Sequence, residues 1–195
     1  MGDRLLPALA LGLSLTACGP SPGDQPLALR ADQSARTLAN VTAPPQSAAP
    51  DPQAVVQAMS SGDAFEIAAA KLALQRSQAR PVRVFAATMA HDHAASSADL
   101  KAALAAAGQP FAAAAAPSSE QQAVLARLSA APPQDFDRAY VRAQVDAHAQ
   151  ALQALQPYAE AGEVTSLRAV ASTAAGAAQR HYAMAEQLKD QLERQ

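Results

Sequence analysis

Apolar residues recur at helical spacing through most of the chain after Asp51, and this periodicity predicts four long helices. Proline and glycine mark their ends. Asp51-Pro52 supplies an N-cap followed by a proline in the first turn, Pro81 separates the first two helices, and Gly108 ends the second. The predicted helices cover roughly 52–79, 81–107, 132–161 and 163–193.

The connection between the second and third helices is longer than the other two. Gln109 to Pro117 contains an alanine run, and Ser118, Ser119 and Glu120 provide caps for a short helix that ends near Ser129. The other two turns are short and force neighbouring helices to run antiparallel. The sequence therefore predicts an all-α fold, an antiparallel four-helix bundle with a short extra helix in its long connection.

Each inward stripe of the predicted bundle contains one residue that does not belong in an apolar core. In the fourth helix the predicted stripe is Leu167, Val170, Ala174, Ala177, His181, Met184 and Leu188. The four polar residues, one per helix, are Glu66, His93, His148 and His181. Counting back to the turns at about 1.5 Å per residue places all four at nearly one level.

Three imidazoles and a carboxylate at one level form a chemically sensible site for one Fe, Zn or Mn ion. The alternative is a metal-free hydrogen-bonded network that fixes the register of the helices, because buried ionisable groups need partners. Asp92 lies beside this layer, where it either orients an imidazole of a neighbouring helix or is solvated. Asp146 is expected to be solvated, and His91 to point outward.

The N-terminus predicts export. Asp3 and Arg4 precede an apolar run from Leu5 to Leu15, which is shorter than the roughly 20 residues needed to span a bilayer. Leu15-Thr16-Ala17-Cys18 then resembles a bacterial lipobox, in which the cysteine is acylated. Residues 1–17 are thus predicted to be a lipoprotein signal peptide and Cys18 the lipidation site. The alternative is an ordinary signal peptide with a chance cysteine.

The predicted anchor sets the location of the protein. Gly19 follows the cysteine where an aspartate would resemble an inner-membrane retention signal, so we expect an outer-membrane anchor facing the periplasm. Residues 18–51 are rich in Pro, Ser, Gln and Ala and are predicted to be a disordered tether, since they bury too little to offset their ordering entropy. The helical domain is then predicted to span 52–193.

Composition narrows the classes of partner. Aromatic residues make up 4% of the chain, and alanine dominates its hydrophobic half, which favours helices packed through small side chains. The formal net charge is −2, and Lys and Arg do not cluster with aromatics, so a nucleic acid is not an expected partner. The single cysteine excludes an internal disulfide.

Several segments resemble the ferritin-like bacterial proteins grouped as domain of unknown function 4142. The resemblance runs from about Pro52 to Leu188 and rests on two local patterns, Met89-Ala90-His91-Asp92-His93 and Gln144-Val145-Asp146-Ala147-His148. It implies a ferritin-like bundle, commonly on exported proteins, and no particular activity.

Di-iron members of the wider ferritin-like group carry a glutamate on two helices and Glu-x-x-His on the other two. Ala90 and Ala178 stand three residues before His93 and His181 in this chain, so a di-iron oxidoreductase is poorly supported. The sequence favours a non-enzymatic envelope module that binds protein partners or serves stress tolerance. The alternative is a periplasmic bundle that binds a transition metal through the Glu/His layer.

Overall fold

The computed structural model describes residues 51–194, which form five α-helices. The fold is all-α, as predicted, and the part of the chain described contains no strand. The predicted signal peptide, Cys18 and most of the predicted tether lie outside the described residues. None of the helices described is long and apolar enough to cross a membrane. The helices are α2 (Pro52–Arg76), α3 (Arg80–Ala107), α4 (Ser119–Ala130), α5 (Pro133–Ala161) and α6 (Thr165–Glu193).

The helix ends follow the capping residues in the sequence. The side chain of Asp51 accepts a hydrogen bond from the Gln53 N–H at the start of α2, and Gly108 ends α3 in the left-handed conformation at φ 67°. The first helix stops at Arg76, three residues earlier than predicted. Ser77 is already extended there, and its backbone N–H donates to the Ala73 carbonyl. Its hydroxyl then accepts from the Ala79 N–H at 3.2 Å, which favours a turn.

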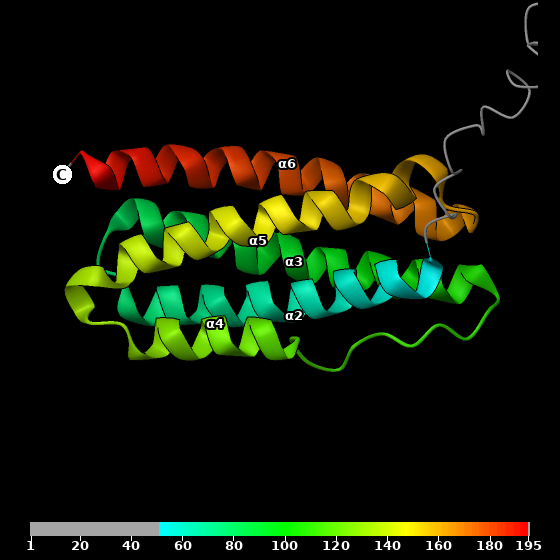
Figure 1. The fold of residues 1–195 in the computed structure, drawn as a ribbon, viewed down its shortest axis with the longest axis horizontal. Helices are drawn as coiled ribbons and strands as arrows, with labels where there is room; N and C mark the ends of the chain where they lie inside the picture. Colours follow the sequence, from blue (N-terminus) through cyan, green and yellow to red (C-terminus); the bar gives the residue numbers. More distant parts are fainter. Residues whose placement is uncertain (1–50, 195) are drawn as a thin grey trace, which may run out of the picture. The chain divides into compact units, whose positions relative to one another are not determined.

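The four long helices form a bundle in which each packs on two neighbours. α2 and α3 form one antiparallel hairpin and α5 and α6 another, with α3 against α6 and α2 against α5 (Figure 1). The connection from α3 to α5 runs back along the length of α2 and includes α4 (Figure 1). One long crossover of this kind also occurs in ferritin-like bundles.

The crossover is fastened to α2 by side chains. Gln53 and Gln57 both donate through Nε2 to the Ala112 carbonyl, and the Ser60 hydroxyl accepts from the Ala114 N–H at 2.7 Å. At the other end of α2, the Arg76 guanidinium donates to carbonyls at the end of α4 and lies 4.7 Å from the centre of the Phe136 ring. These bonds hold α4 over the seam between α2 and α5.

The core consists of two apolar clusters. One contains Phe65, Met89, Phe136 and Tyr140, and the other contains residues such as Val56, Leu100, Tyr158 and Leu167. Between them lie buried polar side chains of α2, α5 and α6, which are Asp63, Glu66, Gln144, His148 and His181. The partly buried His93 adds one from α3. The bundle is therefore apolar toward each end and polar at mid-length.

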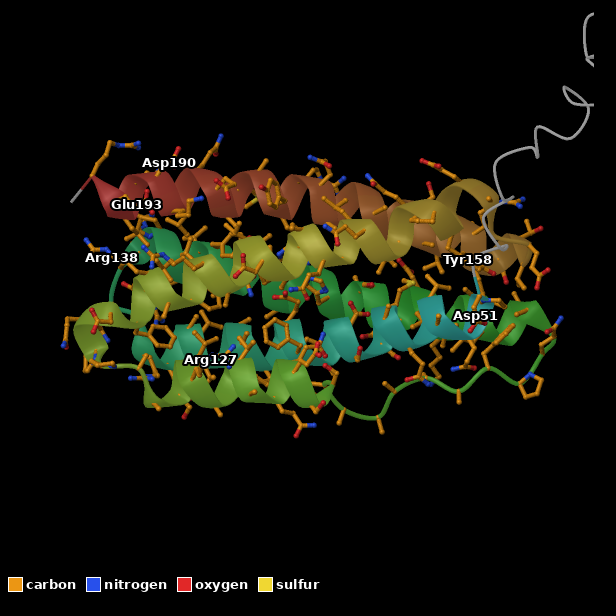
Figure 2. The ribbon with its side chains drawn as sticks, viewed as in Figure 1. Asp51, Arg127, Arg138, Tyr158, Asp190 and Glu193 are labelled. Atoms are coloured by element: carbon orange, nitrogen blue, oxygen red, sulfur yellow. The ribbon has the colours of Figure 1, made fainter. Side chains whose placement is uncertain are left out.

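One residue that was predicted to face the core from α6 does not do so. Met184 is 37% exposed, whereas its neighbour Ala185 is fully buried. A repeat of 3.6 residues per turn drifts across a seven-residue pattern, so the inward position moves by one residue toward the end of a long helix. Figure 2 shows Glu193, Arg138 and Asp190 at this end of the bundle, opposite Tyr158 and Asp51.

Candidate metal centre

Three of the four sequence-predicted site residues meet in the polar layer. His93 on α3, His148 on α5 and His181 on α6 each direct one ring nitrogen toward the others, and these three atoms lie within 4.8 Å of one another. The distances between ring centroids are 5.2 Å for His148–His181, 5.6 Å for His93–His181 and 5.8 Å for His93–His148. Three residues from three different helices thus form one compact group of nitrogens.

The outward nitrogen of each imidazole has a fixed acceptor. His93 donates from Nδ1 to Asp63 Oδ1 at 2.9 Å, and His181 from Nε2 to Asp92 Oδ2 at 2.9 Å. His148 donates from Nδ1 to the backbone carbonyl of Gln144 at 2.8 Å, one helical turn earlier on α5. Such partners fix which nitrogen carries the proton and how each ring is oriented.

The inward nitrogens have no partner. His93 Nε2, His148 Nε2 and His181 Nδ1 are buried and make no hydrogen bond. A buried polar atom left without a partner costs roughly 1–3 kcal/mol. Three such atoms facing one another present three lone pairs to a common point, which is the donor set that a transition-metal ion requires.

The pKa values of the three imidazoles shift in different directions. It lowers the pKa of His148 to about 4, and it lowers that of His181 against the opposing hydrogen bond to Asp92. Burial also acts to lower the pKa of His93, but the hydrogen bond that His93 donates to Asp63 and the charge of Glu66 outweigh it and raise that pKa. Two of the three imidazoles are therefore held neutral, the form that binds a metal.

Glu66, the fourth predicted ligand, lies near the group of three imidazole nitrogens but does not belong to it. Its carboxylate is not among the atoms that lie within 4.8 Å of one another. It is 3% exposed and accepts a hydrogen bond from Gln144 Nε2 at 2.7 Å. Burial raises the pKa of Glu66 to about 7, although the charge of His93 and the Gln144 bond act to lower it. The structure thus places Glu66 as a neighbour of the three imidazoles.

The residues beside the layer take distinct positions. Asp92 holds the ring of His181, which is the orienting role that the sequence left open. Asp146 is exposed and His91 is exposed at the surface, where its Nδ1 bonds Asp92 at 2.9 Å. The hydrogen bonds to both His91 and His181 lower the pKa of Asp92, so its carboxylate stays charged.

Sequence reasoning missed two residues of the site. Asp63 is 4% exposed and bonds both His93 and, through Oδ2, the Ser97 hydroxyl at 3.1 Å. The signal was available, because Asp63 lies four residues after Met59 and so shares its inward face. Gln144 is fully buried and one helical turn before His148. Its amide links Glu66 to the imidazole layer.

The donor set restricts the chemistry. Three imidazoles without a carboxylate in the group do not form the paired carboxylate sites of di-iron bundles. Ala90 and Ala178 occupy the positions where the Glu-x-x-His pattern needs a glutamate. Three histidines do suit one tetrahedral ion, which keeps a fourth position open for another ligand.

Comparisons with known proteins agree with the fold. The family model described as "Domain of unknown function (DUF4142)" matches residues 37–188. A crystal structure of a DUF305 fragment from Deinococcus radiodurans is similar, with a TM-score of 0.62 and 24% sequence identity over 72% of this chain and 97% of that one. This likeness concerns the fold alone. The chain matches no curated protein sequence.

Proposed function

We propose that this chain, which belongs to the family of domain of unknown function DUF4142, binds one divalent transition-metal ion through His93, His148 and His181. The observation that carries the proposal is the set of three buried, unpartnered nitrogens that face one another. The acceptors on the opposite nitrogens hold the rings in this orientation before a metal arrives, which reduces the ordering cost of binding.

A metal-free network accounts less well for the same atoms. The sequence by itself favoured a metal-free interaction or stress-related module, in which the polar layer serves to fix helix register. A network of that kind should pair the inward nitrogens with one another or with Glu66, because unpaired buried groups are costly. The hydrogen bonds of the three imidazoles run to acceptors on their opposite sides instead, and Glu66 bonds Gln144.

The donor atoms favour some ions over others. Imidazole nitrogen suits zinc, copper, iron(II) and nickel, whereas manganese prefers carboxylate and carbonyl oxygen. Among the three ions that the sequence suggested, a group of three nitrogens without a carboxylate therefore favours zinc or iron over manganese. Copper is a further ion that suits this group. A storage, buffering or sensing role follows from reversible binding at such a site.

Metal binding is testable with the four histidines of the chain. We expect the full chain, purified without a histidine tag and stripped with a chelator, to bind one Zn²⁺ or Cu²⁺ per chain in equilibrium dialysis. His148→Ala and His181→Ala should each lower the affinity by more than about 100-fold, since each removes a ligand rather than a supporting contact. His91→Ala is the comparison variant and should lower the affinity far less, because His91 is 83% exposed and reaches the group only through Asp92.

Two results would refute metal binding at this site. One is a stripped wild-type chain that takes up no ion. The other is uptake that His91→Ala abolishes as strongly as His148→Ala does. Circular dichroism of each variant establishes that the helices are retained, so that a lost fold is not mistaken for a lost ligand.

The proposed location is the cell envelope, with Cys18 as the lipid anchor. It is supported by the apolar run of Leu5 to Leu15 and by the position of the single cysteine directly after Leu15-Thr16-Ala17. A Cys18→Ser chain expressed in a Gram-negative host should leave the membrane fraction and retain its signal peptide. Unchanged fractionation of that variant would rule out the anchor.

A further inference from the structure

A cavity of about 980 Å³ adjoins the three imidazoles. Its lining includes His93, His148 and His181 and comes from all five helices. Eleven of the lining residues are alanines, whose side chains leave space that larger residues would fill. The polar layer is therefore connected to a chamber larger than a bound metal ion needs.

The chamber offers room for a further ligand of the metal. Three histidines complete only three of the four positions around a tetrahedral ion, and the remaining one must point to solvent or to a ligand. Glu66 also lines the chamber, and a carboxylate there accepts a hydrogen bond from a ligand that carries a proton. Metal and carboxylate together would hold such a molecule at two atoms.

The charge of the lining selects among ligands. Six carboxylate side chains and three arginines line the chamber, so its lining is acidic. Asp63, Glu66 and Asp92 are the ones near the imidazoles, and Asp63 and Glu66 are less than 5% exposed. The three arginines, by contrast, are all exposed, and Arg127 lies on α4, which carries none of the three histidines (Figure 2). The charge of Arg180 acts on the neighbouring His181 imidazole more weakly than that of Asp92 does. The carboxylates of Asp63, Glu66 and Asp92 offset the 2+ charge of a bound ion, so a multiply charged anion would gain little attraction close to the metal.

We infer that this cavity is a ligand chamber for the open position of the metal, and that it takes small uncharged molecules with a nitrogen or oxygen donor and a proton to donate. The inference rests on the proposed metal site and adds a second binding event to it. The ligand would coordinate the metal through a lone pair, and its N–H or O–H would donate a hydrogen bond to the Glu66 carboxylate.

Gly62 offers a way to obstruct the chamber without touching a ligand residue. It lines the cavity on α2, and a Cβ built there meets no atom within 4 Å. Gly62→Leu should therefore fold and place its side chain in the cavity. Gly176→Leu is the matched control, because Gly176 is an exposed glycine in the interior of α6 and does not line the cavity.

The test uses the full chain loaded with Co²⁺, whose visible spectrum reports changes in coordination. Imidazole, added as a small neutral probe, should shift the bands in a saturable way, and phosphate at the same concentration should not. Gly62→Leu should leave Co²⁺ affinity unchanged and weaken imidazole binding by about tenfold or more, the equivalent of roughly 1.4 kcal/mol. Gly176→Leu should behave as wild type in both titrations.

The outcomes separate the two proposals. Bound Co²⁺ whose spectrum ignores imidazole, or responds equally to phosphate, overturns the ligand chamber and leaves the metal site intact. The same holds if Gly62→Leu binds imidazole as wild type does, or if imidazole simply removes Co²⁺, as measured by metal analysis after dialysis. A chain that binds no Co²⁺ overturns both proposals.

Discussion

Metal-free Glu66→Gln protein should be more stable than wild type at pH 8, by roughly 2 to 3 kcal/mol, and by only about 1 kcal/mol or less at pH 5. Burial raises the pKa of Glu66 to about 7 from an ordinary value of 4.5. Between these values the folded chain holds a proton that the unfolded chain has lost. Folding stability therefore falls as the pH rises from about 4.5 to about 7, and the cost is complete above that range.

Glutamine removes this cost because it is neutral at every pH and of the same size. Its carbonyl can still accept from Gln144 Nε2, which donates to Glu66 at 2.7 Å. The charge of Glu66 also raises the pKa of His93, so the replacement removes an attraction to a protonated His93, which acts to reduce the stability difference between the two proteins. Urea unfolding at both pH values measures it. Exposed Glu160→Gln should change little, and a Glu66→Gln advantage that does not grow between pH 5 and pH 8 would contradict the burial of this carboxylate.

Gly162→Ala should lower the free energy of unfolding by about 2 to 4 kcal/mol, the range for disrupting a buried aromatic side chain. A Cβ at Gly162 would overlap the Tyr158 ring and approach the Tyr158 carbonyl oxygen to 2.6 Å. Tyr158 is 1% exposed and belongs to the apolar cluster beside the α5–α6 turn. The ring must therefore leave its place in the core, or the turn must shift.

At a second glycine, replacement by alanine is expected to raise the free energy of unfolding rather than lower it. Gly176 lies in the interior of α6, and a Cβ there meets only an arginine nitrogen at 3.7 Å. Gly176→Ala should raise stability by about 0.5 to 1 kcal/mol, since alanine loses less backbone entropy in a helix. Thermal unfolding of both variants gives the comparison. Equal effects at the two positions would show that the Gly162 contact with Tyr158 does not restrict the turn.

The bounds of the helices could be predicted because the residues that set them act on nearby backbone groups. Asp51, Gly108 and Ser118 act on backbone groups within a few residues, so capping and periodicity place the helix ends to within a few positions. The end of α2 at Arg76 was missed because no proline or glycine stands there. Its cause is the hydroxyl of Ser77, a polar side chain that supports either a helix or a turn.

The candidate site could be predicted from the sequence only in part. The meeting of His93, His148 and His181 could be anticipated, because one polar residue per inward stripe and equal distances from the turns are properties of a sequence. The role of Glu66 could not be anticipated. A shift of about one helical turn along α2 decides whether its carboxylate is a ligand of the metal or a neighbour of the imidazoles. The structure gives its hydrogen bond to Gln144 instead.

By itself, the sequence determined an all-helical fold for the part of the chain after Asp51, its order of helices and the three histidines of one layer, because these follow from short-range backbone chemistry and from helical periodicity. Only the tertiary structure decided which ring nitrogens face inward, that Asp63, Asp92 and the Gln144 carbonyl hold the outward ones, and that a chamber adjoins them. Those features depend on side-chain rotamers and on how closely alanine-lined helices approach, and neither is encoded in the spacing of residues along one helix.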